Sequence, residues 1–144
     1  MQDIRGLDFT VSDRTALEHF TRAVDLLHAY RRDPMAELAA ALEIDPAFAM
    51  AHAMRGALLC TMTEKGVIPL VRDAVAAATR HLGRASDRER RHVEAVAAWA
   101  GGDLRRATET WGRIVIDFPR DTLALQLAHL GDFYLGQAVT LRDR

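Results

Sequence analysis

The chain has 144 residues, of which 49% are hydrophobic and 27% are charged, and its 19 basic and 20 acidic side chains leave a formal charge of −1. This composition excludes a disordered chain, a collagen-like chain and a disulfide-rich scaffold, and the balanced charge argues against a general affinity for nucleic acid or anionic membranes. The length indicates a single domain, residues 1–144, and the lone Cys60 permits no internal disulfide.

Apolar residues recur at spacings of three and four along the whole chain, which predicts an all-α protein of about seven or eight helices. Proline and capping residues set the expected boundaries in the first half of the chain. The predicted helices of this half run from Ser12, as N-cap, to near Arg31, from Met35 to Glu43, from Asp45-Pro46 to near Lys65-Gly66, and from Pro69 to Leu82.

In the second half the helix boundaries are marked by stronger capping signals. Ser86 and Glu89 have the spacing of a capping box, in which each side chain accepts a hydrogen bond from the other residue's backbone N–H. The predicted helices run from Ser86 to Ala100, from Asp103 to Asp117, and from Asp121 to Leu135, where Gly136 should end the last of them.

A repeat of 34 residues underlies these helices. The segment Arg88–Asp121 carries small residues at its eighth, fifteenth and twentieth positions, an aromatic residue at its twenty-fourth and a proline at its thirty-second: Ala95, Gly102, Ala107, Trp111 and Pro119. This pattern resembles a tetratricopeptide repeat, in which small residues let paired helices approach closely. Extended along the chain, it predicts an α-solenoid of antiparallel helix pairs, with repeats at about 15–48, 49–87, 88–121 and an incomplete 122–144.

Three stretches indicate a narrower relationship: AFAMAHAMRGALL (Ala47–Leu59), RERRHVEAVAAWAGGDLRRATETW (Arg88–Trp111) and FPRDTLALQLAHLGDFYLGQAVTLRDR (Phe118–Arg144). They resemble the N-terminal part of the tetratricopeptide repeat protein 38 family. The resemblance implies a solenoid of divergent repeats and no catalytic activity that can be assigned to a residue. Members of that family are a few times longer, so the chain is expected to be a fragment or a short natural relative.

In such repeats the first helix of each pair lines a concave groove. The second, fifth, ninth and twelfth positions of those helices here are mostly apolar, and they lack the Lys and Asn pattern that binds a C-terminal carboxylate. We therefore expect a scaffold or adaptor that binds a peptide or helix of a protein partner. An alternative is that the same residues form the core of a tightly wound solenoid. The predicted groove residues are His19, Met50, Ala53, Glu89, His92, Val96, Trp99, Gln126, Leu130 and Phe133.

The predicted C-terminal end carries no polar cap. Its last helix has more apolar surface than one neighbouring pair can cover, from Leu123 to Leu135. Either Ala138–Leu141 fold back as a short helix, or the end is covered by a protein partner or by a second copy in a homodimer.

A polar set offers a different function. His52, Arg55, His92, His129 and Asp132 could form the site of an enzyme or enzyme subunit between first helices of adjacent repeats. No HExxH, CxxC, phosphate-binding loop or nucleophile motif accompanies them, so we expect no metal, no cofactor and no enzyme. The arginines between Arg80 and Arg91 are either an edge for phosphate or acidic peptide, or a solvated face.

Two further features concern the setting of the protein. The chain has no run of roughly 18 apolar residues and its opening residues lack a signal-peptide pattern, so we expect a cytoplasmic protein without a membrane span. All basic residues except Lys65 are Arg, and 25 residues are Ala, a bias typical of GC-rich bacterial genomes. The arginine content by itself is therefore not a functional signal.

Overall fold

The computed structural model describes residues 1–29, 34–62 and 65–142, and within them the protein is all-helical. The predicted fold class is confirmed at this level: the described residues contain seven α-helices, two short 3-10 turns (Lys65–Val67 and Leu82–Arg84) and no β-strand. The helices are α1 (Arg14–Ala29), α2 (Met35–Ile44), α3 (Ala49–Cys60), α4 (Ile68–Arg80), α5 (Asp87–Ala100), α6 (Leu104–Asp117) and α7 (Thr122–Arg142).

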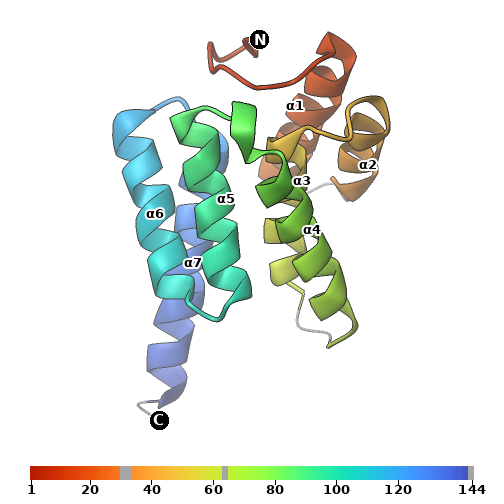
Figure 1. The fold of residues 1–144 in the computed structure, drawn as a ribbon. Helices are drawn as coiled ribbons and strands as arrows, with labels where there is room; N and C mark the ends of the chain where they lie inside the picture. Colours follow the sequence, from red (N-terminus) through yellow and green to blue (C-terminus); the bar gives the residue numbers. More distant parts are fainter. Residues whose placement is uncertain (30–33, 63–64, 143–144) are drawn as a thin grey trace.

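Consecutive helices pack in pairs. The most extensive contacts join α1 to α2, α3 to α4 and α5 to α6, and α7 packs on α6 in the same way. Neighbouring pairs meet through α2 against α3, α3 against α5 and α4 against α5. In Figure 1 the helices alternate in direction along the chain, so that α3, α5 and α7 run the same way. We refer to α1, α3 and α5, the first helices of the three pairs, together with α7 as the A helices.

Local capping signals set several boundaries as expected. The capping box of Ser86 and Glu89 is present, with Ser86 N–H donating to Glu89 Oε1 at 3.0 Å and Glu89 N–H donating to Ser86 Oγ at 3.3 Å. Asp103 Oδ1 accepts the N–H of Arg106 at 3.1 Å at the start of α6. Gly102 before it has a φ of +93°, a backbone conformation that favours glycine.

Three boundaries in the first half differ from prediction. Asp13, not Ser12, caps α1, by accepting the N–H of Thr15 at 2.7 Å. The Asp45-Pro46 signal forms a turn in which Asp45 accepts the N–H of Ala47, and α3 begins only at Ala49. That helix ends at Cys60, short of the expected Lys65-Gly66, because the chain turns at Thr61.

The C-terminal helix is longer than expected. Residue Gly136 does not end it, and α7 continues without interruption from Thr122 to Arg142. The described residues therefore contain no separate helix at Ala138–Leu141 and no second helix of a fourth repeat. A glycine in a helix interior costs about 1 kcal/mol relative to alanine, which the long helix evidently tolerates.

The core runs through the pairs and includes the largest fully buried side chains: Leu17, Leu38, Phe48, Met50, Met54, Trp111, Ile114 and Leu127. Trp111, the aromatic residue of the 34-residue pattern, packs edge-on against Trp99 with ring centroids 5.8 Å apart. Both rings belong to the α5–α6 pair, and Trp111 is fully buried. The predicted end of the first helix, near Arg31, lies outside the described residues.

Candidate binding groove

Residues 1–12 form a non-helical segment that covers the beginnings of the A helices, which lie together beneath it in Figure 1. Its Phe9 is 5% exposed and packs on Phe20 and Phe48, with ring centroids 5.2 and 6.2 Å away. The space between this segment and α1, α3, α5 and α7 is reduced to a cavity of about 10 Å³. We call this region the closed end.

A buried ion cluster lies beneath the closed end. Asp121 Oδ2 accepts from Arg88 Nη1 at 2.8 Å and from His92 Nε2 at 2.7 Å, and its Oδ1 accepts the N–H of Ala124 at 2.9 Å. Arg88 also donates to the carbonyl of Asp8 at 2.8 Å. Burial alone would raise the pKa of Asp121, but the charge and hydrogen bond of His92 and the charge of Arg88 hold it well below its usual range. The carboxylate therefore stays ionised and joins α5, α7 and the N-terminal segment.

Glu89 makes a second connection between the segment and α5. Besides completing the capping box, its Oε2 accepts the N–H of Thr10 at 3.0 Å and its Oε1 accepts the Thr10 hydroxyl at 2.7 Å. The carboxylate is completely buried. Its hydrogen-bonding capacity is thus used inside the protein.

Five of the predicted groove residues lie in the core under the closed end. The structure buries Met50, Ala53, Glu89, His92 and Val96. Met50 and Glu89 lie in the first turns of α3 and α5, whereas Ala53 and Val96 lie further along these helices. At these positions the side chains are core residues, which is the alternative considered for them.

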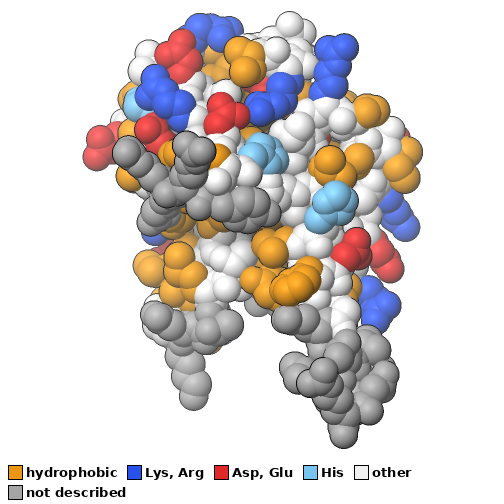
Figure 2. Space-filling view, turned by 180° about the vertical axis from the view of Figure 1, so that it is seen from behind, with side chains coloured by type: hydrophobic (Ala, Val, Ile, Leu, Met, Phe, Trp, Pro, Cys, Tyr) orange, Lys and Arg blue, Asp and Glu red, His pale blue; other side chains and the backbone are white. Residues whose placement is uncertain are grey.

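A groove remains open beyond the closed end, along α7 and the last turns of α1 and α3. Its volume is about 810 Å³, and it is lined by Leu27, His28, Leu58, Thr61, Thr122, Leu125, Gln126, Leu127, His129, Leu130, Phe133 and Tyr134. Figure 2 views the molecule from behind relative to Figure 1, and hydrophobic side chains gather in its lower half, around this groove. The predicted residues Gln126, Leu130 and Phe133 are brought together here.

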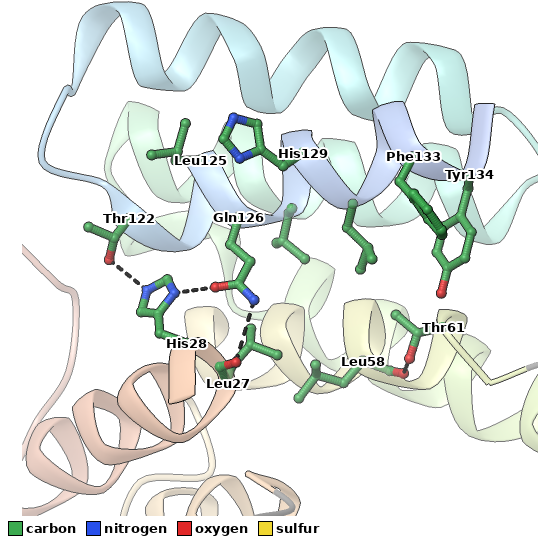
Figure 3. Close-up of a pocket in the computed structure, with 12 residues that line it drawn as sticks. Leu27, His28, Leu58, Thr61, Thr122, Leu125, Gln126, His129, Phe133 and Tyr134 are labelled. Atoms are coloured by element: carbon green, nitrogen blue, oxygen red, sulfur yellow. Dashed lines mark hydrogen bonds between the residues drawn. The ribbon is translucent and has the colours of Figure 1, made fainter. Parts of the chain in front are cut away.

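A polar contact between the first and the last A helix bounds one end of the groove (Figure 3). His28 on α1 contacts Gln126 through Nδ1 and Thr122 through Nε2, the latter at 3.0 Å. Gln126 Nε2 donates to the carbonyl of Leu27 at 3.4 Å, so its Oε1 faces His28 and accepts the Nδ1 proton. Neutral His28 can then accept the Thr122 hydroxyl proton on Nε2. We call these contacts of His28, Gln126, Thr122 and Leu27 the His28 clasp. The clasp holds α7 against α1.

Aromatic and aliphatic side chains form the rest of the groove. Phe133 is 57% exposed and Leu125 is 41% exposed. Tyr134 packs against Phe133 and against Trp99, with ring centroids 5.9 and 6.3 Å away. In Figure 3, Tyr134 and Gln126 extend from α7 toward α1 and α3, whereas Leu125 and His129 point away. Trp99, also predicted to line the groove, supports this wall from α5.

The remaining predicted groove residue lies elsewhere. His19 Nδ1 contacts Glu37 Oε2 at 2.6 Å and Arg22 Nη1 at 3.3 Å, in a polar cluster between α1 and α2. It is not part of the groove lining.

The alternative polar set is distributed over different surroundings. His92 is buried in the ion cluster, His129 is exposed on the groove, and Asp132 is exposed on α7. His52 stacks on His81, with ring centroids 6.1 Å apart, and donates from Nε2 to the carbonyl of Pro46. Burial, followed by the charges of His81, Arg55 and Arg80, lowers its pKa.

Two chemical features bear on catalysis. Burial raises the pKa of the Cys60 thiol to about 11, which leaves it a poor nucleophile at neutral pH. Nowhere in the part of the chain that the structure describes do three or more His, Cys, Asp or Glu side chains gather in a way that could hold a metal ion.

Nine of the twelve residues that line the groove were not among the predicted groove residues. Leu27, His28, Leu58, Thr61 and Tyr134 fall on the tenth to fourteenth positions of their repeats, later than most of the positions expected to line the concave face. The groove lies near the ends of α1 and α3 because residues 1–12 cover the inner face near the beginnings of the A helices. The available signal was the alternation of apolar Leu7, Phe9 and Val11 with polar residues in a segment without helical pattern.

Of the helices described, none combines the length and the apolar character that crossing a membrane requires. No protein-family model matches the chain, and no solved structure has a significant match to it.

Proposed function

We propose that the protein is a short tetratricopeptide-like scaffold that binds one amphipathic helix of a partner protein in the groove between α1, α3 and α7. The paired helices and the contacts from the second helix of one pair to the first helix of the next support an arrangement of this type. The resemblance of three stretches to the tetratricopeptide repeat protein 38 family is consistent with it. The observation that carries the proposal is the open groove with its exposed Phe133.

The shape and chemistry of the groove favour a helix as the occupant. Its wall on α7 runs from Thr122 to Tyr134, about 18 Å at 1.5 Å per residue, which corresponds to roughly three turns of a partner helix. The wall is apolar along Leu127, Leu130 and Phe133, whereas the His28 clasp supplies polar groups at one end. An amphipathic helix presents apolar residues at three- and four-residue spacing to such a wall and keeps its polar face in water.

A selection experiment tests the proposal. Amphipathic helical peptides displayed on phage are selected on the wild-type protein and counter-selected on Phe133→Glu, and the Kd of each selected peptide is measured by fluorescence anisotropy. Phe133 is 57% exposed, so its substitution should leave the fold intact. Because a charged side chain at an aromatic contact site loses about 2 kcal/mol or more, the Kd should rise by about thirtyfold.

Ile116→Glu is the matched control. Ile116 is 77% exposed on α6, where it adjoins the charged hollow between α5 and α6 and is not part of the groove. The control variant should bind the selected peptides as the wild type does. Failure to select any peptide, or equal weakening by both substitutions, would overturn the proposal.

Sedimentation distinguishes a partner helix from a second copy of the chain. A monomer of 16.0 kDa leaves the groove available to a partner. A dimer that the Phe133→Glu substitution converts to a monomer would show that α7 of a second copy covers the groove, and would replace the partner helix by a homodimer through the C-terminal helix.

A further inference from the structure

A second hollow lies on the outer side of the closed end. Its volume is about 430 Å³, and it is formed by the N-terminal segment, the turn before α3 and the connection from α4 to α5. The lining residues are Thr10, Val11, Ser12, Asp45, Ala47, Arg80, His81, Gly83 and Arg84. Three of these side chains can carry positive charge, and one carries negative charge.

Some arginines of the described residues form ion pairs, but the two of this hollow do not. Arg5 pairs with Asp25, Arg88 with Asp121, and Arg91 with both Asp87 and Asp117. In contrast, no carboxylate of the described residues forms an ion pair with Arg80 or Arg84. The comparable hollow between α5 and α6 contains four arginines and four carboxylates, so its charges balance.

Asp45, the single carboxylate that lines the hollow, accepts hydrogen bonds from backbone N–H groups. Asp45 Oδ1 accepts the N–H of Ala47 at 3.0 Å, and Asp45 Oδ2 accepts the N–H of Ser12 at 2.8 Å. Asp45 is also largely buried. It holds the turn before α3 and the N-terminal segment in place, and it forms no ion pair with Arg80 or Arg84.

The surroundings of His52 indicate that the positive charge is not neutralised. Its ring stacks on His81 at an interplanar angle of 17°. After burial, the influences that lower the pKa of His52 are the charges of His81, Arg55 and Arg80, and no acidic group is among the charges that act on it. Four groups that are cationic or can become so therefore lie near one another beside the hollow: His52, His81, Arg55 and Arg80.

We propose that the hollow binds a phosphate group, held by the guanidinium groups of Arg80 and Arg84 beside the His81 ring. Arginine offers a planar pair of N–H donors that matches two phosphate oxygens, and such charge-assisted bonds are stronger than neutral ones. The volume of the hollow is more than ten times the ~30 Å³ that one water molecule takes up in liquid water. It therefore has room for a small organic group attached to the phosphate. Free phosphate and a small phosphate ester present the same chemistry to the arginines.

Calorimetric titration with inorganic phosphate and, separately, with O-phosphoserine tests the proposal at constant ionic strength. We expect saturable binding, and about tenfold weaker binding for each guanidinium removed in Arg80→Gln and Arg84→Gln, because a hydrogen bond to a charged group contributes about that much. Tighter binding of O-phosphoserine would identify an ester as the ligand, and equal binding would identify free phosphate.

The histidines give an independent readout. The added negative charge of bound phosphate should raise the pKa of His52, measured from its ring C–H resonance in phosphate and in chloride. This shift should be lost when Arg80 and Arg84 are both replaced by Gln. Arg80→Lys, which keeps the charge but not the paired donors, should bind more weakly than wild type and more tightly than Arg80→Gln.

Arg72→Gln serves as the control, since Arg72 is exposed on the same helix, α4, and does not line the hollow. It should bind phosphate as the wild type does. Binding that does not saturate, or that falls equally in Arg72→Gln and Arg84→Gln, would show only general attraction to a basic surface and would overturn the proposal.

Discussion

The two ends of the inner face of the A helices differ in what covers them. At the closed end, residues 1–12 lie over α3, α5 and α7, and the space beneath them is almost filled. Along the last turns of α1 and α3, a groove of about 810 Å³ stays open against α7. Both regions lie on the same array of helices, yet one is an interior and the other is a surface.

The difference shows how a short helical array can divide its inner face. At the closed end the polar groups are buried and paired with one another, as in the Arg88, His92 and Asp121 cluster. In the groove the His28 clasp supplies polar groups at one end, and Phe133 remains in contact with water. Large apolar groups exposed together on one wall are typical of a binding site.

The largest effect should come from breaking the ion cluster of the closed end. The substitution Asp121→Ala leaves Arg88 and His92 buried without their common acceptor and removes the acceptor for the Ala124 N–H. We expect the free energy of unfolding, measured by urea denaturation, to fall by about 3 to 5 kcal/mol. Asp132→Ala on the same helix, where the side chain is exposed, should change it little. Similar losses for the two variants would contradict a structural role for the cluster.

The same carboxylate should make stability sensitive to acid. Its folded pKa lies below its unfolded value of 3.8, so its contribution is complete above that pH and is lost as the pH falls further. In acid titrations followed by circular dichroism, Asp121→Asn should therefore lose less stability than the wild type below about pH 4. A parallel decline in both proteins would mean that other carboxylates control acid unfolding.

A pair of phenylalanine substitutions compares the two regions directly. Phe9→Ala at the closed end removes a ring that contacts Phe20, Phe48 and the Arg88 guanidinium, 4.5 Å from the ring centroid. It should lower the free energy of unfolding by about 3 kcal/mol. Phe133→Ala in the groove should change the same quantity by only about 0.5 kcal/mol, since the ring is mostly exposed. Equal values would mean that the groove is part of the core.

Two glycines of α7 test how firmly this wall of the groove is held. A Cβ at Gly131 would overlap the Thr108 hydroxyl of α6, so Gly131→Ala should destabilise the protein by about 1 to 3 kcal/mol. Combining it with Thr108→Ala should recover part of this loss. Gly136→Ala meets no neighbouring atom and should stabilise the helix by about 0.5 to 1 kcal/mol, observed as a higher Tm. A neutral Gly131→Ala would mean that α6 and α7 pack more loosely than the structure indicates.

The smallest effect should arise from His52 near the closed end. Because its folded pKa lies below the ordinary value of 6.5, the unfolded chain takes up a proton before the folded one as the pH falls. This residue should therefore make the protein slightly less stable at pH 5 than at pH 7, and His52→Gln should remove that difference in urea denaturation. An unchanged pH dependence in the variant would assign the effect to another group.

The sequence by itself determined the helical class and most helix starts. These features depend on signals that act within a few residues, such as the capping box of Ser86 and Glu89 or the Asp103 cap. Three of the predicted groove residues, Gln126, Leu130 and Phe133, line the open groove. Regular helical spacing is enough to give the orientation of residues on one helix.

Only the tertiary structure decided which part of the inner face is closed. The deciding contacts join residues far apart in sequence, with Thr10 and Glu89 79 positions apart, Asp8 and Arg88 80 apart, and His28 and Gln126 98 apart. No local pattern specifies such pairs. The continuation of α7 past Gly136 was likewise not given by the local stop signal. The core beneath residues 1–12 and the groove beyond them follow from these long-range contacts.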